Sequence, residues 1–232
     1  VIGTGVDPDH MDLEPNLVPG YNALVGGSNT LDQHGLSTRT AGIIGAVGNN
    51  GLDIAGLNWQ VSLIPVKACD FAARCTSADV SEGIRWAADA GADIIDVDAL
   101  FANPSADLES AITYARAQGA VVVATAYSTG PGQLAYPAQY SNVIAVGITD
   151  QNDAVASGSG RGAELDVVAP GVNIMTTFAG GGTGASYVPY SAAAHVSGVL
   201  ALLLSKGVAP ADAVQAIYNG AVDLGSPGRD DT

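Results

Sequence analysis

Histidine and cysteine, which often act as general bases, nucleophiles or metal ligands, are rare in this sequence. The chain holds three histidines, His10, His34 and His195, and two cysteines, Cys69 and Cys75. Catalysis by a serine needs an imidazole within hydrogen-bond reach of the hydroxyl and a carboxylate that orients the imidazole. Two cysteines without a nearby histidine do not make a zinc site. Their six-residue separation allows a small disulfide loop, which would suit secretion, and two buried free thiols are the alternative.

The composition excludes several classes of protein. A length of 232 residues predicts one domain with a sizeable core. The net charge is −15, and such an acidic chain repels nucleic acid and anionic membranes, so we expect neither as a partner. The longest apolar run, Val199 to Leu204, is too short to span a bilayer. The simpler interpretation of the acidic composition is that it confers solubility. The alternative is that some of the acidic residues bind cations.

Apolar runs alternate with helical patterns along most of the chain. Strands are expected at 61–66, 93–97, 120–124 and 143–146, and helices at 77–90, 105–118, 191–204 and 210–218. Strand–helix–strand repetition with continuous apolar strands predicts an α/β fold whose mainly parallel sheet is flanked by helices. In such sheets, sites form beyond the carboxyl ends of the strands. We therefore expect chemistry just after Ile2, Val97 and Ala124, and at the turn into the helix near Ser191.

Sequence blocks near those places resemble the subtilisin-like serine proteases (subtilases, peptidase S8). The blocks are 1–7 with 10–13, 41–46, 136–140 with 143–147, 165–171 and 195–198, and they occur in the family's order. The resemblance implies the three-layer subtilisin-like α/β fold, with a mainly parallel central sheet flanked by helices. It implies a single domain over residues 1–232, truncated at both ends relative to the family. It also implies a cis peptide bond between Tyr136 and Pro137.

The positions that carry catalysis in the family hold other residues here. Where the family has the aspartate of Val-Ile-Asp-Thr-Gly, this chain has Gly3, and Leu36 stands at the histidine of Gly-His-Gly-Thr-His. Tyr190 stands at the serine of Gly-Thr-Ser-Met-Ala, and Ser128 at the oxyanion-hole asparagine. The family's Ser-Leu-Gly segment begins here with Asp98. We therefore expect a pseudoenzyme of the serine protease family, which could bind a peptide or a small polar ligand in the old cleft without an organic cofactor.

Two enzymatic alternatives stay open. The first is a serine endopeptidase with residual or rearranged activity, built from Ser191, His34 and Asp32. The second is an enzyme of another reaction class that uses Asp98 and Tyr190 for acid–base work, provided that their pKa values are shifted. A simpler interpretation is that Asp98 pairs with Arg39 and Tyr190 fills vacated space. The residues that could converge around the reshaped cleft are Asp98, Arg39, Tyr127, Ser128, Tyr190 and Ser191.

The resemblance also implies a metal site and a location. Asp12 and Asn50 match positions where the family holds a structural calcium ion, and backbone carbonyls around Gly48, Leu52 and Ile54 would complete the ligands. Hard oxygen donors on a flexible loop suit calcium. Alternatively, Asp12 caps a turn and Asn50 adopts a left-handed conformation. A secreted or extracellular location is expected, although this sequence has no visible signal peptide.

Overall fold

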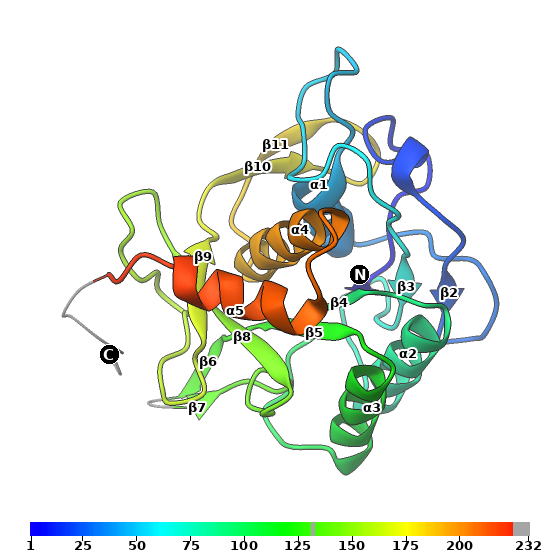
Figure 1. Ribbon diagram of the computed structural model, residues 1–232. Helices are drawn as coiled ribbons and strands as arrows, with labels where there is room; N and C mark the ends of the chain where they lie inside the picture. Colours follow the sequence, from blue (N-terminus) through cyan, green and yellow to red (C-terminus); the bar gives the residue numbers. More distant parts are fainter. Residues whose placement is uncertain (131–132, 225–232) are drawn as a thin grey trace.

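A computed structural model describes residues 1–130 and 133–224, and its centre is a seven-stranded sheet (Figure 1). The strands lie in the order β2-β3-β1-β4-β5-β8-β9, and every neighbouring pair is parallel. Their bounds are β1 (Ile2–Gly3), β2 (Tyr21–Asn22), β3 (Val66–Lys67), β4 (Ile94–Val97), β5 (Val121–Thr125), β8 (Val143–Thr149) and β9 (Val167–Pro170). The predicted α/β fold with a mainly parallel sheet is confirmed.

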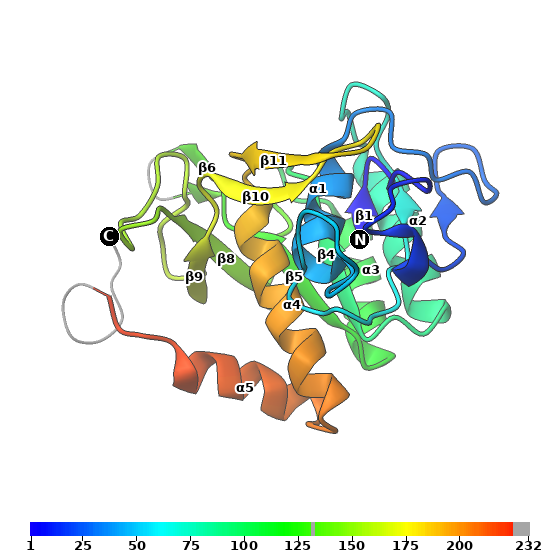
Figure 2. The same cartoon turned by 90° about the horizontal axis from the view of Figure 1, so that it is seen from above.

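Helices cover both faces of this sheet (Figures 1 and 2). On one face lie α2 (Ser77–Asp89) and α3 (Ala106–Ala117), and on the other lie α1 (Leu36–Gly45) and α4 (Ser191–Ser205), with α5 (Pro210–Gly220) against α4. In β5, Val122 and Ala124 join the core beneath α2 and α3, whereas Val121 and Val123 join the core beneath α4. Because both faces are buried, the strand reads as a continuous apolar run.

Side-chain oxygen atoms accept hydrogen bonds from the first turns of α1, α2 and α3. Thr76 accepts a hydrogen bond from the backbone N–H of Asp79 at the start of α2, as the sequence predicts for a cap residue. At α1 the residue before the helix is Gly35, which has no side chain to offer. Asp32 takes over that role, because its carboxylate accepts from the backbone N–H groups of Gly35 and Thr38. The entry into α1 is therefore fixed by a buried acid three residues upstream of Gly35.

Two segments differ from the sequence-based expectations. The strand expected at 61–66 is reduced to β3, because its partner β1 begins only at Ile2, which pairs with Val66. Upstream of β3, Leu63 forms only an isolated bridge to Leu17. Helix α1 was not anticipated, since its ten residues include two threonines, two glycines and two isoleucines, which are weak helix formers. Tertiary packing therefore decides the structure of α1.

The smaller elements surround the sheet. They are the 3-10 helix η1 (Glu14–Asn16) and two antiparallel hairpins, β6 (Ser128–Gly130) with β7 (Gln133–Leu134) and β10 (Ile174–Thr177) with β11 (Thr183–Ser186). The Cys69–Cys75 disulfide and the cis bond between Tyr136 and Pro137 are both confirmed. In the part of the chain that the structure describes, no helix combines the length and the apolar character needed to cross a membrane.

Candidate active-site cleft

Gly3, Asp98 and Tyr190 lie together at the carboxyl edge of the central strands, where the sequence predicts chemistry. Gly3 ends β1, Asp98 directly follows β4, and Tyr190 stands at the N-terminus of α4. The end of β5 joins them, because the Thr125 hydroxyl donates to the carbonyl oxygen of Pro189 at 3.1 Å. Strand ends and helix starts from distant parts of the sequence therefore meet at one edge of the sheet.

Gly3 has no room for a side chain. A Cβ atom at this residue would lie 2.2 Å from Oγ of Ser37 and 2.8 Å from Cβ of Asp98. The Ser37 hydroxyl is held in this place because it accepts a hydrogen bond from the backbone N–H of Thr4 at 3.1 Å. Side chains from α1 and from the end of β4 thus fill the space beside residue 3.

Asp98 is a buried carboxyl group with an unused oxygen. The residue is 2% exposed, and its Oδ1 accepts from the Thr40 hydroxyl at 3.1 Å. Burial and the nearby carboxylate of Asp96 raise the pKa of Asp98 well above its usual value, against the opposing effect of the Ser37 and Thr40 hydroxyls. Within the described residues, Oδ2 has no hydrogen-bond partner. Asp98 therefore has one carboxyl oxygen that is buried without a partner in this part of the chain.

Leu36 and Tyr190, which the resemblance places at the family's histidine and serine positions, carry side chains unlike those of a proton relay. Leu36 opens α1 and is half-buried, and its side chain has no proton acceptor. Tyr190 is 8% exposed, and burial, together with the charges of Asp98 and Tyr127, raises its pKa above the usual value. A phenol that stays protonated at neutral pH is a poor nucleophile. The burial of Tyr190 agrees with the interpretation that this ring fills space.

Ser191, His34 and Asp32 do not form a hydrogen-bonded triad. The Ser191 hydroxyl is buried and has no hydrogen-bond partner among the described residues. His34 is exposed to solvent. Asp32 uses both carboxylate oxygens on α1, because Oδ1 accepts from the backbone of His34 and Gly35 while Oδ2 accepts from the backbone and hydroxyl of Thr38. An acid committed to a helix start in this way does not orient an exposed imidazole.

The remaining histidines are held by backbone groups. Nε2 of His10 lies 2.9 Å from the carbonyl oxygen of Gly182. Nδ1 of His195 lies 2.7 Å from the carbonyl oxygen of Ser191, one turn earlier in α4. Burial also lowers the pKa of His195, so its imidazole favours the neutral form. These contacts give both rings a structural role.

Arg39 does not pair with Asp98, and the simpler interpretation was wrong on this point. Its guanidinium lies over the ring of Phe178, with Cζ 4.7 Å from the ring centroid. The neighbouring residue Thr40 faces Asp98 instead, and one step along a helix turns a side chain by about 100°. The ion pairs found in residues 1–130 and 133–224 are Arg74–Asp70 and Arg85–Asp107. The cleft acid therefore has no cationic partner from Arg39.

Ser128 and Tyr127 are engaged beside the end of β5. The Ser128 hydroxyl donates to the carbonyl oxygen of Gly130 within its own hairpin, at 3.0 Å. The Tyr127 ring packs on Gly158, where a Cβ atom would lie 2.8 Å from the ring. Gly158 also has a φ of 89°, a backbone conformation that favours glycine. Both this φ and the contact with the Tyr127 ring therefore favour glycine at residue 158. Neither side chain forms a hydrogen bond with Asp98.

Asp12 and Asn50, the two side chains expected to bind calcium, contact each other. Nδ2 of Asn50 donates to Oδ1 of Asp12 at 2.8 Å, so these two side chains do lie together. Asn50 does not have the left-handed conformation of the alternative interpretation, and its neighbours Asn49 and Gly51 have positive φ values of 58° and 77°. No group of three or more His, Cys, Asp or Glu side chains in the described ranges is arranged to hold a metal ion. Oxygen ligands from one acid, one amide and the backbone would fit calcium, which stays a prediction.

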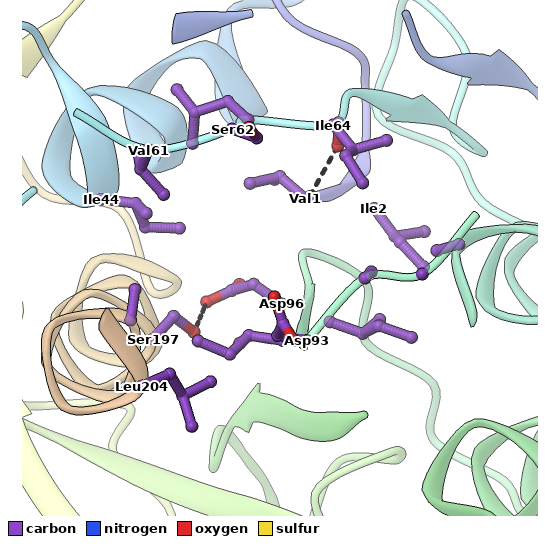
Figure 3. Close-up of a pocket in the computed structure, with 17 residues that line it drawn as sticks. Val1, Ile2, Ile44, Val61, Ser62, Ile64, Asp93, Asp96, Ser197 and Leu204 are labelled. Atoms are coloured by element: carbon purple, nitrogen blue, oxygen red, sulfur yellow. Dashed lines mark hydrogen bonds between the residues drawn. The ribbon is translucent and has the colours of Figure 1, made fainter. Parts of the chain in front are cut away.

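A cavity of about 210 Å³ lies at the opposite, amino end of β4, away from the cleft (Figure 3). Figure 3 shows the ammonium group of Val1 donating to the Ile64 carbonyl and the Ser197 hydroxyl donating to Asp96. Burial raises the pKa of Asp96 to about 6, although Ser197 and the ammonium group act against it. This cavity therefore holds a second buried acid.

The sequence did not identify three residues near these sites, two that contact Asp98 and one that is the acid beside the cavity. Ser37 and Thr40 contact Asp98, and Asp96 lies beside the cavity. The signal for Asp96 was an acid inside a strand predicted to be buried. The signal for Ser37 was a hydroxyl where the family block quoted above has glycine. Thr40 gave no signal, because α1 was not predicted.

The comparisons with known proteins agree with this topology. The sequence pattern of peptidase S8, the Subtilase family, matches residues 1–232. The chain is 38% identical over 228 residues to "Thermophilic serine proteinase" of Bacillus sp. (strain AK1), covering 98% of this chain and 57% of that protein. It is 36% identical over 228 residues to thermitase of Thermoactinomyces vulgaris, covering 98% of this chain and 82% of that protein. Among solved structures, Sphericase aligns with a TM-score of 0.88 at 26% identity, over 95% of this chain and 81% of that one. The chain belongs to the subtilase family of serine proteases, peptidase S8.

Proposed function

We propose that this subtilase does not hydrolyse peptides and instead binds an extended peptide in the former catalytic cleft. The observation that supports this is the set of side chains at Gly3, Leu36 and Tyr190, none of which can pass a proton from a nucleophile to a base. In subtilisin, loss of the serine or the histidine alone lowers kcat by about 10⁶. Loss of one oxyanion-hole donor from an intact active site lowers kcat by about 10²–10³.

The geometry argues against the enzymatic alternatives. Asp32 is committed to the start of α1, and the Ser191 hydroxyl has no partner in the described part of the chain, so a rearranged triad lacks its hydrogen bonds. Tyr190 is buried, and burial moves the pKa of its phenol further above neutral pH, so it cannot serve as the partner of Asp98 in an acid–base pair. General acid–base catalysis works best with a group whose pKa lies near the working pH. We therefore do not propose a second reaction class.

A polypeptide is the ligand class that the relatives favour. The Bacillus relative is named a proteinase, and a related cleft that keeps its framework would still be shaped for an extended chain. Secretion is part of the proposal, since the Cys69–Cys75 disulfide suits an oxidising compartment. Calcium binding by Asp12 and Asn50 is a further part of it, and it predicts that Ca²⁺ raises Tm in the native chain but not in Asp12→Ala.

The test combines turnover with binding. The purified chain is incubated with casein and with fluorogenic peptides between about pH 5 and pH 11, with thermitase as the positive control. We expect no product above the buffer blank, and saturable binding of a fluorescein-labelled peptide that is recovered intact. Product release that disappears in Ser191→Ala would contradict the proposal. Absence of both binding and turnover would limit it to the loss of hydrolysis.

A further inference from the structure

The surroundings of Gly3 show that a missing side chain has been replaced by two others. A Cβ atom at residue 3 would meet Oγ of Ser37 at 2.2 Å, Cβ of Asp98 at 2.8 Å and Oδ2 of Asp98 at 3.4 Å. The related blocks quoted above carry an acid, a glycine and a serine at residues 3, 37 and 98. This chain carries a glycine, a serine and an acid at the same residues. The three residues that differ from the family blocks therefore lie around the same small volume.

We propose that Ser37 and Asp98 together occupy the volume of the absent residue-3 side chain, and that Asp98 supplies from β4 the carboxyl group that β1 has lost. On this proposal the cleft retains the acid of a triad and lacks the imidazole and the nucleophile. Asp98 is then a positioning residue, because it would act through a histidine rather than on a substrate. The inference does not depend on whether the native chain binds a peptide.

The direction of the carboxyl group supports this role. Thr40 lies one turn after Leu36, and residues four apart share a face of a helix. The Thr40 hydroxyl contacts Oδ1 of Asp98 at 3.1 Å, so the face of α1 that carries residue 36 is turned toward this acid. Oδ2 of Asp98 is buried and unpartnered in the described residues. A buried acceptor without a donor is costly, and an imidazole N–H at residue 36 would supply that donor.

The same packing makes an aspartate at residue 3 incompatible with this chain. Its Cβ would overlap Ser37, and its carboxylate would lie beside the carboxyl group of Asp98. Two like charges in one buried place destabilise each other. The overlap should disappear only when Ser37 and Asp98 are changed together with Gly3.

The first experiment is therefore an exchange that needs no catalysis. Gly3→Asp and the triple variant Gly3→Asp/Ser37→Gly/Asp98→Ser are purified and melted by circular dichroism. We expect Gly3→Asp to lose at least about 4 °C in Tm, since overpacking destabilises a core and charge repulsion adds to that loss. We expect the triple variant to recover at least half of that loss. A Gly3→Asp protein with native Tm, or a triple variant no better than Gly3→Asp, would overturn the shared-volume claim.

The second experiment asks whether Asp98 can orient an imidazole. The pKa of the new histidine is measured by NMR in Leu36→His and in the matched control Leu36→His/Asp98→Asn. A carboxylate in contact with an imidazole raises its pKa, and an opposite charge at this range shifts a pKa by about 1–3 units. We expect the histidine pKa to be at least one unit higher when Asp98 is present. Equal values in the two folded variants would overturn the assignment.

The third experiment measures turnover. Leu36→His/Ser128→Asn/Tyr190→Ser supplies an imidazole, an oxyanion donor and a nucleophile while residue 3 stays glycine. We expect peptide hydrolysis in this variant, and we expect Asp98→Asn in the same background to lower kcat by about 10⁴ while KM changes little, as loss of an orienting acid does elsewhere. Folded protein without turnover, or a kcat unaffected by Asp98→Asn, would overturn the proposal. Because these are variants, their failure leaves the function proposed for the native chain unaffected.

Discussion

The packing around Gly3 predicts the cost of adding a single methyl group there. Gly3→Ala places Cβ 2.2 Å from Oγ of Ser37, about 1 Å closer than ordinary contact, so the serine must move. Overpacking of this kind costs about 1–3 kcal/mol, and losing the hydrogen bond from Thr4 to Ser37 costs about 1 kcal/mol more. Gly3 does not have a positive φ, so alanine can adopt its backbone conformation. Alanine also restricts the unfolded chain, which stabilises the folded state by about 0.4–1 kcal/mol. The cost of overpacking exceeds this gain, and the net loss in the free energy of unfolding is about 2–3 kcal/mol.

Urea denaturation and thermal melts measure this loss. For a chain of this size, 1 kcal/mol corresponds to about 2–4 °C, so Tm should fall by roughly 4–12 °C. The matched control is Ser37→Ala, which removes the overlapping atom. In the double variant Gly3→Ala/Ser37→Ala the two changes should cost at least about 1 kcal/mol less than their sum, as expected for residues in contact. A Gly3→Ala protein within about 0.5 kcal/mol of the native stability would refute the packing argument.

Three further predictions follow from other parts of the molecule. Burial raises the pKa of Asp96 to about 6, so its ionisation destabilises the folded state fully above about pH 6 and not below about pH 4. In urea melts, Asp96→Asn should therefore be up to about 3 kcal/mol more stable than the native chain near pH 8. Near pH 4 it should be no more stable than the native chain. Asp32→Ala removes an acceptor of four hydrogen bonds at the start of α1 and should lower the free energy of unfolding by about 3 kcal/mol. The loss should appear as faster hydrogen exchange at the Thr38 amide, and an unchanged exchange rate would contradict this prediction. Replacing both Cys69 and Cys75 by alanine opens a small loop and should cost about 2 kcal/mol in chemical denaturation, with no cost arguing against a stabilising role.

Most of the sheet and its helices could be predicted from the sequence. The strand that became β5 reads as a continuous apolar run because helices bury both of its faces. Thr76 marks the start of α2 because its hydroxyl oxygen accepts from the first turn. In contrast, α1 has no such pattern, and its position depends on Asp32 and on contacts with distant strands. Local sequence rules carry no information about contacts of that kind.

The candidate site was predicted less completely than the fold. The resemblance located Gly3, Leu36 and Tyr190, and simple chemistry then indicated what those side chains cannot do. The contact between Asp98 and the space beside Gly3 joins residues 95 positions apart, so no local pattern could reveal it. The expected pairing of Asp98 with Arg39 failed because a one-residue step on α1 points the guanidinium elsewhere.

The most direct test of the absent proton relay is covalent labelling of the native chain with a fluorophosphonate probe. Such a probe reacts with a serine only when a base removes the hydroxyl proton. We predict that intact-mass spectrometry finds no adduct after prolonged incubation, under conditions in which thermitase is fully labelled. An adduct of one probe per chain on Ser191, or on any other serine, would contradict the proposal that this chain lacks a working base beside a nucleophile.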